Sequence, residues 1–329
     1  MKILVVSGFL GAGKTTFIKE LSRKTRRDFV VMENEYAQAD IDRELLNEEK
    51  AVNIWELTEG CVCCSMKTDF ASSILTIANT LDPEYLVVEP TGAAVLSRII
   101  ANIRQIEYER ITLLRPITIV DADSFSLCLR DYRELFLDQL KTAGTIVVSR
   151  RSFSSEEEIR DFSKTLAEIN PDASIQVPHY SHAAPSWWES LLSSSYDGGR
   201  NVPESSPETP DLETFSLYDI SLPGSMQLLW FLENLSRGAF GKIVRAKGIV
   251  TLPDTRLRFD LSNGLYSITG FAGDGRSNGV FIGTGIRRAQ IRKLLVPGFL
   301  DIPSAPGDSS RKQILRLPRQ PRGKQGKHP

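Results

Sequence analysis

The chain has 329 residues, which exceeds a typical single domain and predicts two domains with tails. Its 41% hydrophobic and 25% charged residues are typical of a soluble globular protein, and a net charge of -1 excludes a global attraction to nucleic acid or membranes. No run of 18 or more apolar residues is present, so we expect a cytoplasmic protein without a membrane span.

The first half alternates apolar runs with amphipathic stretches, such as Phe17, Ile18 and Leu21 at helical spacing. The runs occupy residues 3–7, 29–32, 85–88, 117–120, 145–148 and 174–177. This βαβα pattern predicts an α/β domain at residues 1–192 with a doubly wound, mostly parallel sheet. Near its end, Trp187 and Trp188 predict a helix that packs on this domain.

Residues 8–15, GFLGAGKT, match the phosphate-loop pattern G-x-x-x-x-G-K-[ST] between a predicted strand and a predicted helix at 15–23. Backbone N–H groups of such a loop surround phosphate, its lysine places a positive charge on the β- and γ-phosphates, and its threonine hydroxyl binds Mg²⁺. The expected nucleotide-binding residues of the loop are Gly8, Gly11, Ala12, Gly13, Lys14 and Thr15. The alternative is a glycine-rich turn without a ligand.

Two further segments resemble the nucleotide-sensing parts of such domains. In LVVEPTG, Glu89 would orient a metal-bound water and Gly92 would donate its backbone N–H to the γ-phosphate, unless this is an ordinary strand-to-helix loop. We therefore expect Lys14 and Glu89 to be catalytic. In the acidic segment after residue 32, Asp42 is a candidate Mg²⁺ ligand and Glu35 a candidate soft-metal ligand; a solvated acidic loop is the alternative.

Three of the four cysteines, Cys61, Cys63 and Cys64, lie within four positions, directly before an amphipathic helix that begins near Phe70. In an extended segment Cys61 and Cys63 face the same side, so both thiolates could bind one Zn²⁺ or Co²⁺ ion. Cys64, Glu35 or water could complete the coordination. Redox-active or simply packed cysteines are the alternative.

The second half begins with a polar segment at 193–211, rich in Ser, Pro and Gly, which predicts a flexible linker. Expected strands at 215–220, 241–251, 256–260, 265–269 and 280–283, with helices at 226–234 and from residue 286, predict a smaller α+β domain at 212–300 with a meandering sheet. The tail at 301–329 is basic and expected to be disordered; we do not expect it to bind nucleic acid.

These motifs together resemble one family. The segments SGFLGAGKTTF, ENE, EGCVCC, EPTG and TIVDADSF, followed by GKIVRAKGIV, LRFDLSNGLYSITG and NGVFIGTGI, are similar to the CobW-like P-loop GTPases, relatives of the nickel chaperones HypB and UreG. The resemblance covers almost everything except the linker and the tail. It implies GTP hydrolysis coupled to metal delivery, a metal site at Cys61, Cys63 and Cys64, and a phosphate or Mg²⁺ role for Thr16.

The chain departs from the family where the base is recognised. After the strand at 145–148, the usual Asn-Lys-x-Asp motif is replaced by Ser149-Arg150-Arg151-Ser152, which lacks the carboxylate that reads guanine. We expect Ser149 and Arg150 to lie at the nucleotide, and ATP remains open beside GTP because a site without this carboxylate discriminates less. Ala37 also replaces the usual glycine after an aromatic residue, Tyr36, in the first switch.

The leading hypothesis is a metal chaperone or insertase that hydrolyses GTP or ATP with Mg²⁺ and delivers Zn²⁺ or Co²⁺ to an unknown client metalloprotein. Slow turnover without a partner is expected, because no arginine finger can be assigned from the sequence. One alternative is a nucleotide-binding adaptor that acts through its C-terminal domain, with redox or structural cysteines. A small-molecule kinase, which shares the phosphate loop, is a third and the least favoured, because the C-terminal domain resembles that of the family. A homodimer is compatible with each of these functions.

Overall fold

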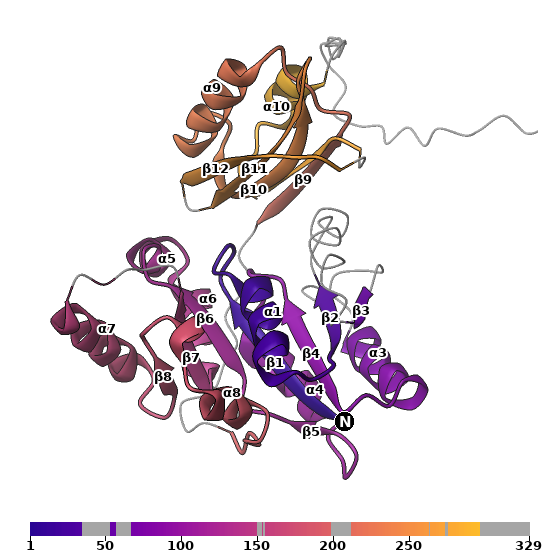
Figure 1. Ribbon diagram of the computed structural model, residues 1–329, viewed down its shortest axis with the longest axis vertical. Coiled ribbons are helices and arrows are strands. Elements are labelled where there is room, and N and C mark those ends of the chain that lie inside the picture. Colours follow the sequence, from indigo (N-terminus) through magenta and orange to yellow (C-terminus); the bar gives the residue numbers. More distant parts are fainter. Residues whose placement is uncertain are drawn as a thin grey trace, which may run out of the picture.

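The computed structural model describes residues 1–34, 53–56, 67–149, 153, 155–198, 212–262, 264–273 and 276–296 (Figure 1). Within them the chain forms a larger parallel α/β unit followed by a smaller antiparallel α+β unit, which confirms the expected fold class. No helix among these residues is long and apolar enough to cross a lipid bilayer.

The strands of the first unit pair in the order β3-β2-β4-β1-β6-β7-β8, with β5 beside the start of β1, and every pairing is parallel. Their bounds are β1 Lys2–Gly8, β2 Val30–Asn34, β3 Asn53–Glu56, β4 Tyr85–Pro90, β5 Thr112–Leu113, β6 Ile117–Asp121, β7 Thr145–Ser149 and β8 Ser174–Gln176. All six predicted strands are present. The sequence missed β3 and β5, which are only four and two residues long.

Helices cover both faces of this sheet. They are α1 Lys14–Thr25, α3 Lys67–Thr80, α4 Leu96–Arg104, α5 Phe125–Asp131, α6 Arg133–Thr142, α7 Glu156–Ile169 and α8 Pro185–Leu191, with a 3-10 turn at Tyr180–His182. Within β1, Ile3 and Val5 join the core with α3 and α4, whereas Leu4 and Val6 join the core with α1 and α8. This alternation follows from the two-residue repeat of a strand and demonstrates the doubly wound arrangement.

Helix α8 packs on α1, which confirms the role predicted for the tryptophan pair. Trp188 is completely buried and its ring stacks on that of Phe17 with 5.4 Å between centroids. Trp187 is only partly buried at the edge of the same cluster. The contact connects α8 to the helix that follows the phosphate loop.

The chain remains packed beyond α8. Tyr196 is buried in the core under α3 and α4, its amide donates to the carbonyl of Leu113, and its hydroxyl donates to the carbonyl of Thr142 at 3.2 Å. Residues 193–198, expected at the start of the linker, therefore lie against the first unit. The amide of Arg115 also donates to the carbonyl of Ser194 at 3.0 Å, so backbone contacts hold the segment together with the tyrosine.

The second unit is an antiparallel sheet in the order β12-β11-β10-β13-β9 with α9 and α10 on one face. Its elements are β9 Glu213–Tyr218, α9 Ser225–Ser236, β10 Lys242–Thr251, β11 Arg256–Ser262, β12 Leu265–Gly270, β13 Asn278–Thr284 and α10 Arg288–Leu295. Only β10, β11 and β12 form a meander. The expectation of a fully meandering sheet is wrong, because β13 pairs with β10 on its other side and β9 closes the far edge.

We predict that Trp188→Ala lowers the free energy of unfolding by about 3–5 kcal/mol, because it leaves a large cavity beside Phe17. Trp187→Ala is the matched control and should cost about 1 kcal/mol, as is usual for a partly buried residue. Denaturant unfolding followed by circular dichroism measures both. Equal, small losses would contradict the anchoring role of α8.

Candidate nucleotide-binding site

The loop between β1 and α1 has the backbone of a phosphate-binding loop. Gly8, Gly11 and Gly13 have φ values of 144°, 80° and 96°, and the amide of Ala12 donates to the carbonyl of Phe9 at 3.1 Å to close a turn. The N-cap residue of α1 is Gly13, which has no side chain to occupy the helix end, and no acidic residue lies in the first helical turn. The N–H groups of the first helical turn and the helix dipole at this end therefore favour an anion.

The side chains of the loop lie where phosphate and Mg²⁺ would need them. Lys14 is buried and its Nζ donates to the carbonyl of Gly8 at 3.1 Å, so the ammonium lies over the loop. Thr15 Oγ1 donates to Oε1 of Glu89, at the end of β4, at 2.9 Å. Thr16 is exposed in the first turn of α1.

A hydroxyl and a carboxylate in direct contact are the hard oxygen donors that Mg²⁺ prefers, so Thr15 and Glu89 fit that ion. The two residues are 74 positions apart in the sequence. Strands β1 and β4 are neighbours, which places the loop and the end of β4 at the same edge of the sheet. The structure thus brings together two residues that the sequence predicted separately.

Gly92, two residues after β4, lies directly against the phosphate loop. A Cβ atom at this position would be 2.4 Å from the backbone nitrogen of Leu10, so only glycine permits the contact. The turn is closed by the amide of Ala94, which donates to the carbonyl of Thr91 at 2.9 Å. The predicted γ-phosphate sensor and the phosphate loop therefore share one packed contact.

A residue that the sequence did not indicate holds this sensor turn. Gln139 of α6 is fully buried, and its Nε2 donates to the carbonyls of Gly92 and Ala94, both at 3.1 Å. The carbonyl of Gln139 itself accepts from the hydroxyl of Thr118 on β6 at 2.8 Å. The side-chain amide thus fixes the turn to the helix layer beneath the sheet.

The neighbouring residue Asp138 holds the start of α4. Its carboxylate accepts from the amide of Ser97 at 3.1 Å, and burial raises its pKa against the opposing effect of that hydrogen bond. The available signal in the sequence was a polar pair, Asp138 and Gln139, inside the apolar segment 135–140. Such a pair inside a buried helix needs partners, but the sequence does not say which ones.

Ser149 lies at the end of β7 and contacts the loop itself. Its hydroxyl is buried and donates to the carbonyl of Ala12 at 2.7 Å. The side chain therefore fixes the phosphate loop to the neighbouring part of the sheet. A hydroxyl engaged in this way supports the phosphate site, and the expectation of a base contact at Ser149 gains no support from it.

Several predicted site residues lie outside the described part of the chain. They are Glu35, Asp42, Cys61, Cys63, Cys64 and Arg150, together with Tyr36, Ala37, Arg151, Ser152 and the tail at 301–329. Among the residues that are described, no group of three or more His, Cys, Asp or Glu side chains could hold a metal ion. The soft-metal site therefore stays a prediction.

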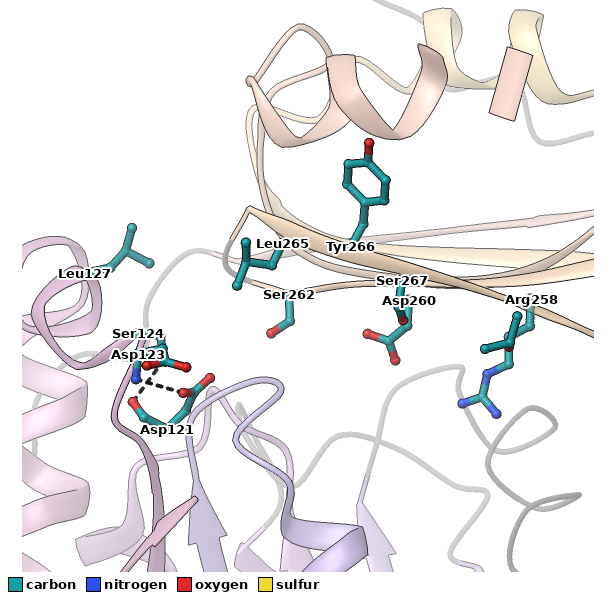
Figure 2. A pocket seen from close by; sticks show the side chains of 11 residues that line it. Asp121, Asp123, Ser124, Leu127, Arg258, Asp260, Ser262, Leu265, Tyr266 and Ser267 are labelled. Atoms are coloured by element: carbon teal, nitrogen blue, oxygen red, sulfur yellow. Dashed lines mark hydrogen bonds between the residues drawn. The ribbon is translucent and has the colours of Figure 1, made fainter. Parts of the chain in front are cut away.

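A polar pocket of about 670 Å³ lies between the two units (Figure 2). Asp121 and Asp123 line it from the end of β6 and the following loop, and Asp260 and Ser262 line it from β11. The amide of Asp123 donates to Asp121 Oδ1 at 3.0 Å, which shapes the lower rim. Ser262 also contacts the phosphate loop, so the pocket adjoins that loop from outside.

Comparison with known proteins identifies both units. Residues 2–177 match the family model of the CobW/HypB/UreG nucleotide-binding domain, and residues 223–296 match that of the cobalamin synthesis protein CobW C-terminal domain. The zinc chaperone YjiA of Escherichia coli (strain K12) is 29% identical over 181 residues, which cover 53% of this chain and 56% of YjiA. The zinc-regulated GTPase metalloprotein activator 1 of Dictyostelium discoideum is 23% identical over 309 residues, 78% of this chain and 64% of the relative.

The chain thus spans between half and two thirds of the length of these two relatives. Among solved structures, the crystal structure of Zn(II)-bound YjiA GTPase from E. coli has 23% sequence identity and a TM-score of 0.42. The match covers 89% of this chain and 97% of that chain.

We predict that Gln139→Leu weakens triphosphate binding about tenfold, because two buried carbonyls of the sensor turn lose their donor at a cost of about 1–3 kcal/mol. Diphosphate binding should change less than about twofold, since only the γ-phosphate reaches Gly92 in this assignment. Gln105→Leu, an exposed glutamine at the end of α4, is the matched control. Calorimetric titration with both nucleotides measures the ratio, and equal weakening of both would contradict the assignment.

Proposed function

This chain belongs to the CobW/HypB/UreG nucleotide-binding family, and from that premise we propose that it is a nucleotide-driven metal chaperone that hydrolyses GTP. The observation that carries the proposal is the contact of Thr15 with Glu89 beside the phosphate loop. It unites a phosphate cradle, a buried lysine and a Mg²⁺-compatible oxygen pair at one edge of the sheet. This combination serves nucleotide triphosphate hydrolysis.

Each described residue has a role in this proposal. The backbone of residues 8–13 and Lys14 bind the β- and γ-phosphates, and Thr16 contacts the phosphates from the first turn of α1. Thr15 and Glu89 hold Mg²⁺, and Glu89 also orients the attacking water. Bound Mg²⁺ neutralises charge on the phosphates. Gly92 reports the presence of the γ-phosphate.

The strand register supports placing the cargo metal beside this site. Glu33 of β2 pairs with Glu89 of β4 on one side and with Glu56 of β3 on the other, so the three strands end at one level. The segment with Glu35 and Asp42 leaves β2 there, and the segment with Cys61, Cys63 and Cys64 leaves β3 there. Both segments thus start at the edge that carries the phosphate loop.

We propose that Cys61 and Cys63 bind the cargo metal, with Cys64 or Glu35 completing the site, and that Asp42 assists Mg²⁺. The names of the relatives favour Zn²⁺ over Co²⁺ as the cargo. Triphosphate binding orders both segments, and hydrolysis loosens them so that a client metalloprotein receives the ion. GTP is the preferred nucleotide on family grounds, with ATP as the alternative because the guanine-reading carboxylate is replaced at Ser152.

We predict that Lys14→Ala weakens nucleotide binding about 100-fold while the fold is retained, because the charge of this buried lysine neutralises phosphate. Lys19→Ala on the same helix α1 is the matched control and should bind normally. Fluorescence titration with a labelled nucleotide measures both affinities, and circular dichroism checks the fold. Wild-type affinity in Lys14→Ala would refute the phosphate-loop assignment.

The metal role predicts reciprocity: the nucleotide must change metal affinity by the same factor by which the metal changes nucleotide affinity. Competition of the reduced protein against a chromogenic chelator for Zn²⁺ and Co²⁺, with Mg²⁺ and GTP, GDP, ATP or no nucleotide, measures this factor. We expect tighter metal binding with the triphosphate and at least tenfold weaker binding in Cys61→Ser and Cys63→Ser.

Cys128→Ser is the matched control, because burial raises the pKa of the Cys128 thiol to about 12 and keeps it from acting as a thiolate ligand. Equal metal affinity in all nucleotide states would contradict the chaperone function. It would favour a nucleotide-binding adaptor instead.

A further inference from the structure

The outer side of the phosphate loop, residues 9–11, is covered by the C-terminal unit. Phe9 and Leu10 are each 2% exposed and belong to the same core cluster as Val244, Val280 and Ile282. These three valine and isoleucine residues lie on β10 and β13, whereas Phe281 between them points to the opposite face, under α9 and α10. The C-terminal sheet therefore has one face packed on its helices and the other on the phosphate loop (Figure 1).

Polar side chains of the same sheet contact the loop at Leu10 and Gly11. Ser262 of β11 donates from Oγ to the carbonyl of Leu10 at 3.4 Å. A Cβ atom at Gly11 would lie 1.9 Å from Ser262 Oγ and 3.1 Å from Nη1 of Arg245. Gly11, at φ 80°, thus has no room for a side chain, because the second unit occupies that space.

Arg245 is held rigidly in this contact. Its side chain is 8% exposed and forms two hydrogen bonds to Asp260, at 2.8 and 2.9 Å. Figure 2 shows Asp260 and Ser262 pointing from β11 toward the nucleotide-binding unit. A bidentate pair of this kind fixes the guanidinium in one orientation beside Gly11.

A second connection reaches the loop through aromatic rings. Lys242 of β10 forms an ion pair with Asp131 at 3.0 Å, and its Nζ lies 5.2 Å from the ring centroid of Tyr132. The ring of Tyr132 in turn lies 4.9 Å from that of Phe9 in the phosphate loop. Both connections end on residues 9–11.

We infer that the C-terminal sheet holds the phosphate loop in its binding conformation, with Ser262 and Arg245 as positioning residues, so that nucleotide affinity depends on the docked C-terminal unit. The inference rests on the proposed function, since it concerns the same phosphate site. A partner that draws the C-terminal unit away releases nucleotide, and a nucleotide that changes the loop changes the docking by the same factor.

The first experiment replaces Ser262 in the full-length chain. Ser262→Asp places a carboxylate against the outer side of the loop, and we expect it to weaken GDP and GTP binding at least tenfold. Ser267→Asp is the matched control, because Ser267 is exposed, lines the same pocket and pairs in register with Asp260 on the adjacent strand. It should bind within about twofold of the wild type. Equal affinities in the two variants would overturn the inference.

The second experiment tests the contact with Gly11 directly and does not depend on Ser262→Asp folding. Gly11→Ala should weaken nucleotide binding, and adding Ser262→Gly should recover at least fivefold of that loss, because it removes the two closest atoms that a Cβ would meet and leaves only Arg245 Nη1 at 3.1 Å and the strain of an alanine at φ 80°. Independent effects, with no recovery in the double variant, would overturn the inference. Thermal unfolding without nucleotide separates a change in fold from a change in affinity.

Measuring the wild-type chain and Lys14→Ala alongside distinguishes a failure of the positioning role from a failure of the proposed function. Normal wild-type binding that is lost in Lys14→Ala but kept in Ser262→Asp would leave the proposed function intact and overturn only the positioning role. Absence of nucleotide binding in the wild type would overturn both.

Discussion

The conformation of the phosphate loop needs support from every layer of the fold around it. Its three glycines have positive φ, and most of its N–H groups must face a ligand rather than a carbonyl of the loop. Glycine adopts such φ values without strain, so the elements that pack against the loop select this conformation. Ser149 fixes the carbonyl of Ala12, and Gly92 packs against Leu10.

These supports come from different layers of the fold. Gln139 and Asp138 of one helix, α6, reach both the turn at Gly92 and the start of α4. Both side chains lie on the buried side of α6, so each needs a hydrogen-bond partner within the fold. The same helix therefore connects the turn at Gly92 to the core, and a change at this turn must either break these hydrogen bonds or move the helix.

The sequence was sufficient for features that depend on local pattern. The phosphate loop, the strand that ends in Glu89 and the helix with Trp188 each follow from residues that are close in the chain, and the parallel sheet follows from their order. Gln139, Arg245 and Ser262 could not be found in this way. Each is an ordinary polar residue in its own helix or strand, and only the tertiary partner gives it a role.

The contacts between the two units differ in how much they stabilise the docked arrangement. Lys242 is 54% exposed, so its ion pair with Asp131 contributes about 1 kcal/mol or less. The buried apolar side chains of this contact, Phe9 and Leu10 on the loop with Val244, Val280 and Ile282 on the sheet, stabilise it more than the exposed ion pair does. Arg245 and Asp260 lie within the same unit, so their ion pair orients the arginine and does not bind one unit to the other.

Ligands couple distant sites in proteins by about 1–3 kcal/mol. On the inference above, a partner that removes part of the apolar contact changes the phosphate site without unfolding either unit, and the Arg245–Asp260 pair keeps the sheet's side of the contact in one geometry. On the same inference, Phe9 and Leu10 are the apolar surface through which the second unit acts on the phosphate site.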